Sequence, residues 1–387
     1  MDLANIVFAR AGVLMKQNRE RYWDHNNFAI RLSTRQGKPE AGLWFRTRGC
    51  HHDLAGGCVM CDYSAGPATS SEYMVECVRQ GLATLPHHLW HLLCSPSGSL
   101  LDTWEVPEQA REGILALMGA TSYETFSFET RAETITDQVT DQCLTALGGR
   151  GLKIYIGLES ADPWISKYCI NKELSLDEFV RATGVLRSHQ VGVTANVLLG
   201  SPFLTAKQAI EDAVRTTNWA FSVGVTECCL FPTNVKKWTS LHWLYEQGLY
   251  TPPSLWSLVE VLHRLDRGIV ASQIELAWYT SYGAFNVVTA PTTCSACEQQ
   301  VLAYLHHFAE TNDYEDIEQL AALECRCKDV WRALLEASEP APLITRTAAT
   351  YERIGRELIG QNWWLRNHQK VLSALHADMA TSAYNAD

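Results

Sequence analysis

The feature that most constrains the fold is the alternation of short apolar runs with helical segments between about residues 40 and 265. Such alternation is typical of parallel β/α units, in which a helix returns the chain from one strand to the next. The expected strands are residues 41–47, 88–94, 125–129, 152–159, 191–199 and 223–231. Six units fit an incomplete (β/α)6 barrel better than a full barrel of eight, with its chemistry at the carboxyl ends of the strands.

The helices should lie between these strands, and local signals mark two of their starts. The expected helices are residues 70–83, 106–118, 137–147, 175–188, 205–219 and 237–247. Pro107 suits a first helical turn, and Ser175 with Glu178 has the spacing of a capping box. We divide the chain into an N-terminal helical extension (1–40), the barrel core (41–267) and a mainly helical C-terminal subdomain (268–387).

Charge and hydropathy restrict the partners. The chain has 387 residues and a net charge of −11, and no run of basic residues exceeds the Lys236-Lys237 pair. This balance argues against a large polyanion such as tRNA. No apolar stretch reaches the roughly 18 residues of a membrane helix, and the N-terminus lacks the pattern of a signal peptide. We expect a cytoplasmic protein that does not bind membranes.

The 13 cysteines without a secretion signal predict reduced thiols rather than disulfides. In "GCHHDLAGGCVMCDY" (49–63), Cys50, Cys58 and Cys61 follow the first strand and should lie at the barrel mouth. Thiolates bind zinc or iron–sulfur clusters. A structural zinc ion needs four protein ligands, whereas a [4Fe–4S] cluster with three cysteines leaves one iron open to an exchangeable ligand. The triad therefore favours a cluster over zinc.

A second group comprises "CSAC" (294–297) and "CRC" (325–327), with a helix expected over 298–310 between them. Its four thiols are Cys294, Cys297, Cys325 and Cys327. Two close pairs of thiolates make a closed tetrahedral zinc centre. Structural zinc is our first interpretation, and an auxiliary cluster or unliganded core cysteines are the alternatives. A metal here would clamp the C-terminal subdomain onto the barrel.

A cysteine triad after the first strand of a six-unit barrel resembles the radical SAM superfamily. The resemblance implies that S-adenosylmethionine chelates the open iron through its amino and carboxylate groups. An electron from a donor such as flavodoxin or ferredoxin then cleaves it to a 5′-deoxyadenosyl radical, which abstracts hydrogen from a small-molecule substrate. The usual spacing is C-x3-C-x2-C, and this chain has C-x7-C-x2-C.

Polar residues at the strand ends are the candidate contacts to this cofactor: Ser97, Gly98, Ser99, Glu129, Arg131, Glu159, Ser160 and Asn196. The resemblance implies that the segment at Gly98 contacts the methionine amine through its backbone. It also implies that Glu129 and Glu159 face the ribose hydroxyls or the amine. The guanidinium group of Arg131 could donate two parallel hydrogen bonds to the cofactor carboxylate.

A narrower likeness extends from about residue 40 to 332 and rests on "FRTRGCHHDLAGGCVMCDY", "SFETRAETIT", "INK" and "YTPPSLWS". These segments resemble the archaeosine-biosynthesis branch of radical SAM proteins, near the elongator-type branch. That branch implies a lyase that splits a C–N bond of a lysine-modified deazaguanine in tRNA. Because the chain is acidic, a small polar metabolite or a modified nucleoside is at least as good a substrate.

The adjacent Cys228 and Cys229 close the sixth strand and are candidate catalytic thiols. Neighbours in a strand point to opposite faces, so burial of both as small hydrophobic residues is the simpler interpretation. A thiol pair that binds trivalent arsenic is the alternative, and it implies a transferase that moves the 3-amino-3-carboxypropyl group of S-adenosylmethionine to arsenite. A zinc-bearing interaction protein is the candidate from another class, and it predicts neither bound iron nor consumption of S-adenosylmethionine.

Overall fold

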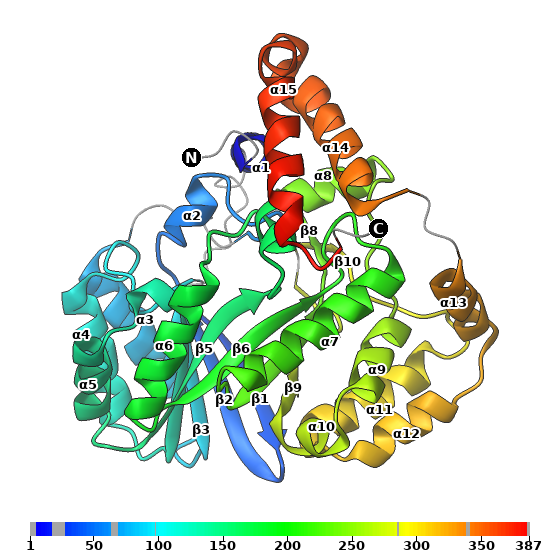
Figure 1. Ribbon diagram of the computed structural model, residues 1–387. Coiled ribbons are helices and arrows are strands. Elements are labelled where there is room, and N and C mark those ends of the chain that lie inside the picture. Colours follow the sequence, from blue (N-terminus) through cyan, green and yellow to red (C-terminus); the bar gives the residue numbers. More distant parts are fainter. Residues whose placement is uncertain are drawn as a thin grey trace.

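A computed structural model describes residues 5–17, 28–62, 69–96, 98–284, 286–337 and 341–384. Eight strands form one curled sheet in the order β1-β2-β3-β4-β5-β6-β7-β9 (Figure 1). Their bounds are β1 Phe28–Arg35, β2 Lys38–Phe45, β3 His91–Pro96, β4 Thr125–Thr130, β5 Gly151–Glu159, β6 Gly192–Leu199, β7 Glu227–Pro232 and β9 Ile274–Leu276. Neighbouring strands from β2 to β9 are parallel, and β1 is antiparallel to β2. The prediction of an incomplete β/α barrel is confirmed.

Helices from α3 to α7 cover the outer face of the sheet, and most helices follow the predicted ranges. Their bounds are α3 Ser71–Thr84, α4 Glu108–Gly119, α5 Asp137–Ala146, α6 Leu176–Ser188, α7 Ala206–Ser222, α8 Ser240–Glu246, α9 Leu255–Arg264 and α10 Arg267–Gln273. Pro107 is the N-cap of α4. Ser175 caps α6 by position, but its side chain makes no capping hydrogen bond, so the predicted capping box is wrong. A complete capping box occurs instead at Thr205 and Gln208, at the start of α7.

Two strands of the sheet lie outside the six predicted. Phe28–Arg35, in the segment expected to be helical, forms β1 and pairs with β2 through a turn at Gln36 and Gly37. Both turn residues have positive φ (50° and 75°), as hairpin turns between twisted strands require. The three-residue β9 closes the other edge beside β7. A small second sheet pairs β8 (Val235–Lys236) with β10 (Val287–Thr289).

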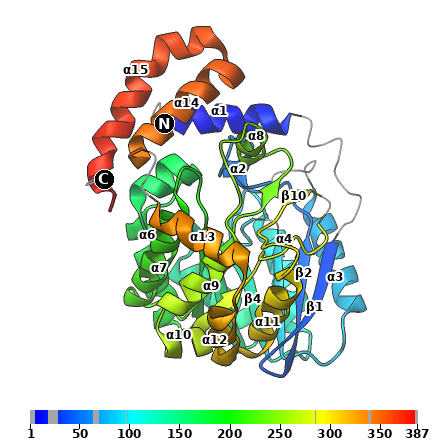
Figure 2. The ribbon, with the colours of Figure 1, turned by 90° about the vertical axis from the view of Figure 1, so that its right-hand side faces the viewer.

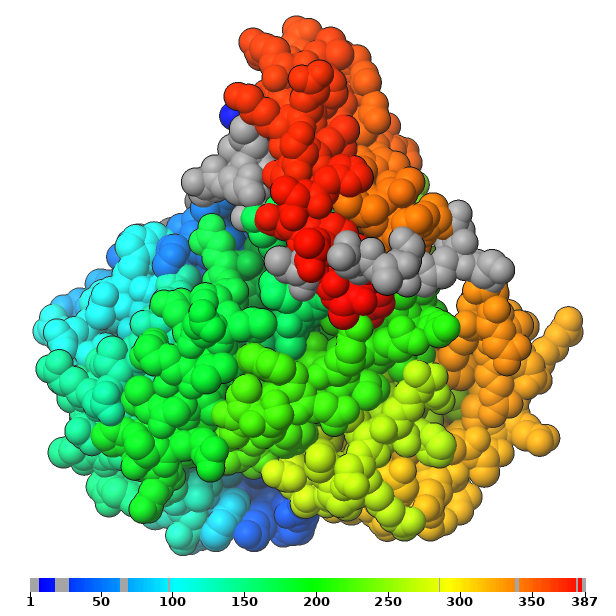
Figure 3. Space-filling view, in the orientation of Figure 1, coloured from blue at the N-terminus to red at the C-terminus, as the bar shows by residue number. Residues whose placement is uncertain are grey.

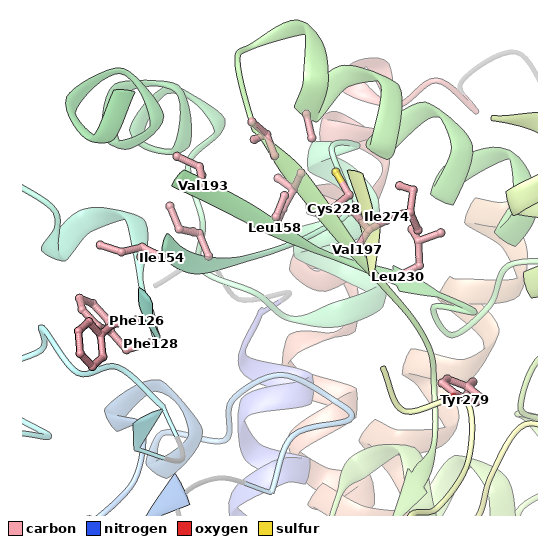
Figure 4. Packing of buried hydrophobic residues seen from close by; sticks show 14 of the residues in the cluster. Phe126, Phe128, Ile154, Leu158, Val193, Val197, Cys228, Leu230, Ile274 and Tyr279 are labelled. Atoms are coloured by element: carbon pink, nitrogen blue, oxygen red, sulfur yellow. The ribbon is translucent and has the colours of Figure 1, made fainter. Parts of the chain in front are cut away.

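The main core fills the layer between the sheet and its outer helices. Phe126, Ile154, Val193 and Cys228 lie in this layer, contributed by four successive strands (Figure 4). All four are completely buried. Alternate residues of the same strands therefore point the other way, into the hollow of the curled sheet.

The C-terminal part is helical: α11 Glu298–Thr311, α12 Tyr314–Ala322, α13 Arg326–Glu336, α14 Leu343–Ile354, the π-helix η4 Gly355–Gly360, α15 Gln361–Asp378 and the short η5 Met379–Thr381. α14 and α15 rise with α1 (Asn5–Lys16) at one end of the barrel (Figures 1 and 2). In the space-filling view they stand above the body of the molecule (Figure 3). A second apolar cluster holds α1, α14 and α15 against the barrel. In it, Phe8, Phe203 and Tyr351 are in aromatic contact. Among the described helices, none has both the length and the apolar character that crossing a bilayer requires.

Candidate functional site

The first cysteine group lies in the loop between β2 and α3, at the carboxyl end of the sheet. Cys50 is the N-cap of the short helix α2 (His51–Leu54), and the chain then bends at Gly56 and Gly57, whose φ angles are 111° and 55°. A Cβ on Gly56 would collide with the backbone of Ala9 in α1. The Gly-Gly step thus permits both the bend and the close packing of α1 on the loop.

The three thiols of this loop are partly buried, and each has cationic neighbours. Burial raises the pKa of Cys50 to about 11 and that of Cys61 to about 12. The charge of Cys58 raises the pKa of both other thiols, so the three groups interact. Arg131 Nη1 points at Cys50 Sγ from 3.9 Å, while Lys236 lowers the pKa of Cys61. Three thiols beside fixed positive charge suit a ligand set that must bind as thiolates.

A cavity of about 880 Å³ occupies the hollow of the sheet and begins at the cysteine loop. Residues aligned by the strand register line it: Glu129 pairs with Tyr155, Asn196 with Cys229, and Cys229 with Glu275. Of the predicted site residues, Cys61, Glu129, Glu159, Asn196 and Cys229 line this one cavity.

The two predicted glutamates differ in their environment. Burial raises the pKa of Glu129 to about 7. Glu159 has a left-handed backbone (φ 64°) and accepts a hydrogen bond at Oε1 from Lys172 Nζ at 3.1 Å. Its buried Oε2 has no hydrogen-bond partner among the described residues. A buried acceptor without a partner is costly, so Oε2 is suited to a hydroxyl or ammonium group of a bound ligand.

The other predicted cofactor contacts that the structure describes do not line the cavity. Ser97 lies outside the described residues. Gly98 lies against the Glu105 carboxylate, and Ser99 is buried with its Oγ 2.6 Å from Thr130 Oγ1. Ser160 is also buried, and its Oγ donates to Asp212 in α7 at 2.9 Å. Ser99 and Ser160 thus have protein partners and do not line the cavity.

Arg131 stands at the rim, beside the cysteine loop. Its Nη2 donates to Asp102 Oδ2 at 2.8 Å, and it forms a second ion pair with Glu133. The predicted pairing of Arg131 with the cofactor carboxylate stays a prediction.

Cys228 and Cys229 point to opposite faces of β7. Cys228 belongs to the core layer between sheet and helices (Figure 4), whereas Cys229 lines the cavity. Burial raises the pKa of both thiols, which keeps them neutral. This arrangement favours the simpler interpretation of Cys228 as a small core residue, and the interpretation of the two as a thiol pair stays a prediction. Cys229, at the cavity, remains a candidate functional thiol.

Two lysines near the triad were not predicted as site residues. Lys172, the last residue of "INK", pairs with Glu159. Lys236 donates to Asp62 Oδ1 at 3.0 Å and lies 4.5 Å from the centre of the Trp278 ring. Both lysines reach the site from loops and short elements, so strand-end positions alone do not reveal them.

The second cysteine group comes together as predicted. Four of its Sγ–Sγ distances are 3.7 Å (Cys294–Cys297) and 3.5 Å (Cys294–Cys325, Cys297–Cys327 and Cys325–Cys327). A Zn–S bond of about 2.3 Å gives a tetrahedral edge of about 3.8 Å. Hydrogen bonds from Cys327 and Cys325 lower the pKa of Cys294 to about 7. The group joins the loop before α11 to the start of α13, so a metal here would tie the two helices.

Sequence comparison places the chain among known proteins, although no family model matches it. Archaeosine synthase subunit beta of Methanosarcina acetivorans is 29% identical over 304 residues, which are 76% of this chain and 84% of that protein. The protein of the same name from Thermococcus kodakarensis is 27% identical over 316 residues, 78% of this chain and 93% of its own. The chain is similar to archaeosine synthase subunit beta over about three quarters of its length. The predicted resemblance to this radical SAM branch, and with it the prediction of an enzyme, is confirmed.

Solved structures resemble the chain more distantly. Elp3 of Methanocaldococcus infernus is 15% identical with a TM-score of 0.45, over 66% of this chain and 60% of that one. Methylornithine synthase (PylB) is 12% identical with a TM-score of 0.44, over 90% of this chain and 91% of its own.

Proposed function

We propose that Cys50, Cys58 and Cys61 hold a [4Fe–4S] cluster, and that the enzyme cleaves S-adenosylmethionine reductively to act on a small polar metabolite or a modified nucleoside. The observation that carries this proposal is that Cys61 of the cysteine loop, Glu129 and Glu159 line one cavity. When bound, the cluster supplies the electron that breaks a carbon–sulfur bond of S-adenosylmethionine.

The residues present fit this cofactor pair. The loop offers three thiols and no adjacent fourth cysteine, which leaves one iron for an exchangeable ligand. Glu159 Oε2 offers the acceptor that a ribose hydroxyl or an amine needs. Glu129 has a pKa of about 7, so near neutral pH it can either be protonated or be ionised beside a cationic group of a bound ligand.

The cavity favours a compact substrate with a planar group. Its volume of about 880 Å³ falls in the usual range of small-molecule sites. Aromatic rings of Trp44, Tyr155 and Trp278 share its wall with the buried acceptor Asn234 Oδ1, which lacks a partner among the described residues. A nucleoside supplies both a planar ring and hydrogen-bond donors. The relatives' name, archaeosine synthase, favours a modified nucleoside, and a lyase acting on tRNA is the second candidate.

Anaerobic reconstitution, followed by incubation with dithionite and S-adenosylmethionine, tests the reaction. We expect 5′-deoxyadenosine in the wild type and none in Cys58→Ala. Cys77→Ala, which alters a buried cysteine of α3, is the matched control and should keep the activity. If methylthioadenosine forms instead, the aminocarboxypropyl transfer replaces this proposal. Retention of tRNA by the wild type with a steep salt dependence would favour the tRNA candidate.

For the second cysteine group we propose a structural zinc ion. The Sγ–Sγ distances of 3.5–3.7 Å match a single tetrahedral ion, whereas a cluster spreads its ligands over several iron atoms. Trp256 Nε1 donates to Cys327 Sγ at 3.2 Å, the kind of supporting hydrogen bond that orients a ligand.

Elemental analysis of protein purified without added iron tests this site. We expect one zinc per chain, lost in Cys297→Ser together with a lower melting temperature and retained in Cys58→Ala. Iron and sulfide that persist in Cys58→Ala and disappear in Cys297→Ser would show that this group holds an auxiliary cluster.

A further inference from the structure

The segment Ile170–Lys172 braces the cysteine loop through its backbone and side chains. Val59 N donates to Ile170 O at 2.9 Å, and Asn171 Nδ2 donates to Gly57 O at 2.7 Å. The ring nitrogen Nε2 of His52 lies 2.8 Å from Asn171 O. These contacts fix the segment against the loop on both sides of its Gly-Gly bend.

The end of a π-helix directs Lys172 into the site. The π-helix η3 (Ile165–Ile170) stops at Asn171, which adopts the left-handed conformation (φ 59°). Asparagine tolerates this conformation better than most residues. The turn sends the next residue, Lys172, back toward the carboxyl end of β5, where its Nζ donates to Glu159 Oε1.

A glycine in β5 leaves room for this ion pair. A Cβ on Gly157 would lie 2.7 Å from Lys172 Nζ and 2.8 Å from Glu159 Oε1. Both side chains of the pair are largely buried, with 18% of Lys172 and 9% of Glu159 exposed. The pair thus occupies a recess that any larger residue at position 157 would fill.

Lys172 also lies near the thiols. The hydrogen bonds of Ile170 to Val59 and of Asn171 to Gly57 flank Cys58, so they hold the next residue, Lys172, near this thiol. Burial lowers the pKa of Lys172, and the ion pair with the Glu159 carboxylate opposes this effect and favours the charged ammonium group. Lys172 therefore stays a cation beside the triad.

We propose that Lys172 is a positioning residue with two roles: it holds Glu159 so that Oε2 faces the cavity, and it keeps a positive charge beside Cys58. The inference rests on the proposed function, because it assigns the charge to a cluster held by the triad. Reduction adds an electron to a cluster, so a nearby buried cation favours the reduced form. Lys172 should therefore raise the reduction potential of the site.

A redox titration of reconstituted protein, followed by electron paramagnetic resonance, tests the charge. We expect Lys172→Met to bind the electron at least tenfold more weakly, a shift of 59 mV to more negative potential for a one-electron couple. Lys172→Arg keeps the charge and should stay within 59 mV of wild type. Lys207→Met, which removes an exposed lysine of α7, is the control for net charge and should leave the potential unchanged. A Lys172→Met potential equal to that of wild type overturns this role.

Equilibrium dialysis of S-adenosylmethionine onto the same reconstituted proteins tests the positioning of Glu159. We expect Glu159→Gln and Lys172→Met each to weaken binding at least tenfold, and the double variant to be no weaker than Glu159→Gln. If the double variant instead weakens binding by the product of the two single effects, Lys172 does not act through Glu159. Gly157→Ala keeps every charge but displaces the pair, so it should weaken binding even if Lys172→Met fails to fold.

Different results would overturn the proposed function and the role of Lys172. A wild-type protein that takes up no iron, or does not bind S-adenosylmethionine, overturns the proposed function. A wild type that does both, with Lys172→Met and Gly157→Ala indistinguishable from it in potential and binding, overturns only the role of Lys172.

Discussion

Asp212 should make the protein lose stability as the pH rises from 5 to 8. This aspartate of α7 is 2% exposed, and its nearest cation, Arg215, is 3.9 Å away. Burial raises its pKa from 3.8 to about 7, while the hydrogen bond from Ser160 lowers it only in part. The folded state thus holds this proton more tightly than the unfolded state does.

The sign and the magnitude of this change in stability follow from the linkage between proton binding and folding. Because the folded pKa is raised, the stabilisation is complete below pH 3.8, decreases as the pH rises and is lost once the pH passes about 7. Each pH unit between the two pKa values costs about 1.36 kcal/mol, so the loss from pH 5 to pH 8 is about 2.5 kcal/mol.

Urea unfolding of the protein without added iron, at pH 5 and at pH 8, measures this loss. Asp212→Asn keeps the shape and has no proton to lose, so its stability should decrease by about 2.5 kcal/mol less than that of wild type over this range. Asp329→Asn changes a carboxylate that is 73% exposed and should behave like wild type. The reasoning is refuted if Asp212→Asn and wild type show the same pH dependence.

Three further substitutions test individual contacts. Gly98→Ala should destabilise the fold by about 1–3 kcal/mol in urea unfolding, because its Cβ would collide with the Glu105 carboxylate. Thr205→Ala removes the side-chain cap of α7 and should cost about 1 kcal/mol in the same assay. Trp256→Phe removes the hydrogen bond to Cys327 and should weaken zinc binding about 10–100-fold in a chelator competition. Unchanged values in these assays would contradict the corresponding contact.

The sequence pattern predicts the parallel strands and both cysteine groups because these signals are local. Apolar runs mark buried strands, and C-x2-C spacing needs only one turn of chain. The pattern failed at β1 because that strand is half exposed, with Leu32 58% exposed, and so lacks a buried run. The turn residues Gln36 and Gly37 were the available signal for a hairpin.

The errors at the site have a similar cause. Period-two alternation separates Cys228 from Cys229, so this pair could contribute one residue to the cavity. Ser160 follows the end of β5 and turns instead toward Asp212. Lys172 could not be predicted this way, because it reaches the site from the end of a π-helix after a left-handed Asn171. Its direction depends on tertiary contacts with the cysteine loop and not on any repeat in the sequence.

The iron and sulfide content of anaerobically reconstituted protein tests the central claim most directly, when wild type, Cys50→Ala, Cys58→Ala and Cys61→Ala are compared with Cys297→Ser. We predict four iron and four sulfide per chain in wild type and in Cys297→Ser, and loss of this cluster from each triad variant. Wild-type protein without sulfide-bound iron, or triad variants that keep the cluster, would contradict the account.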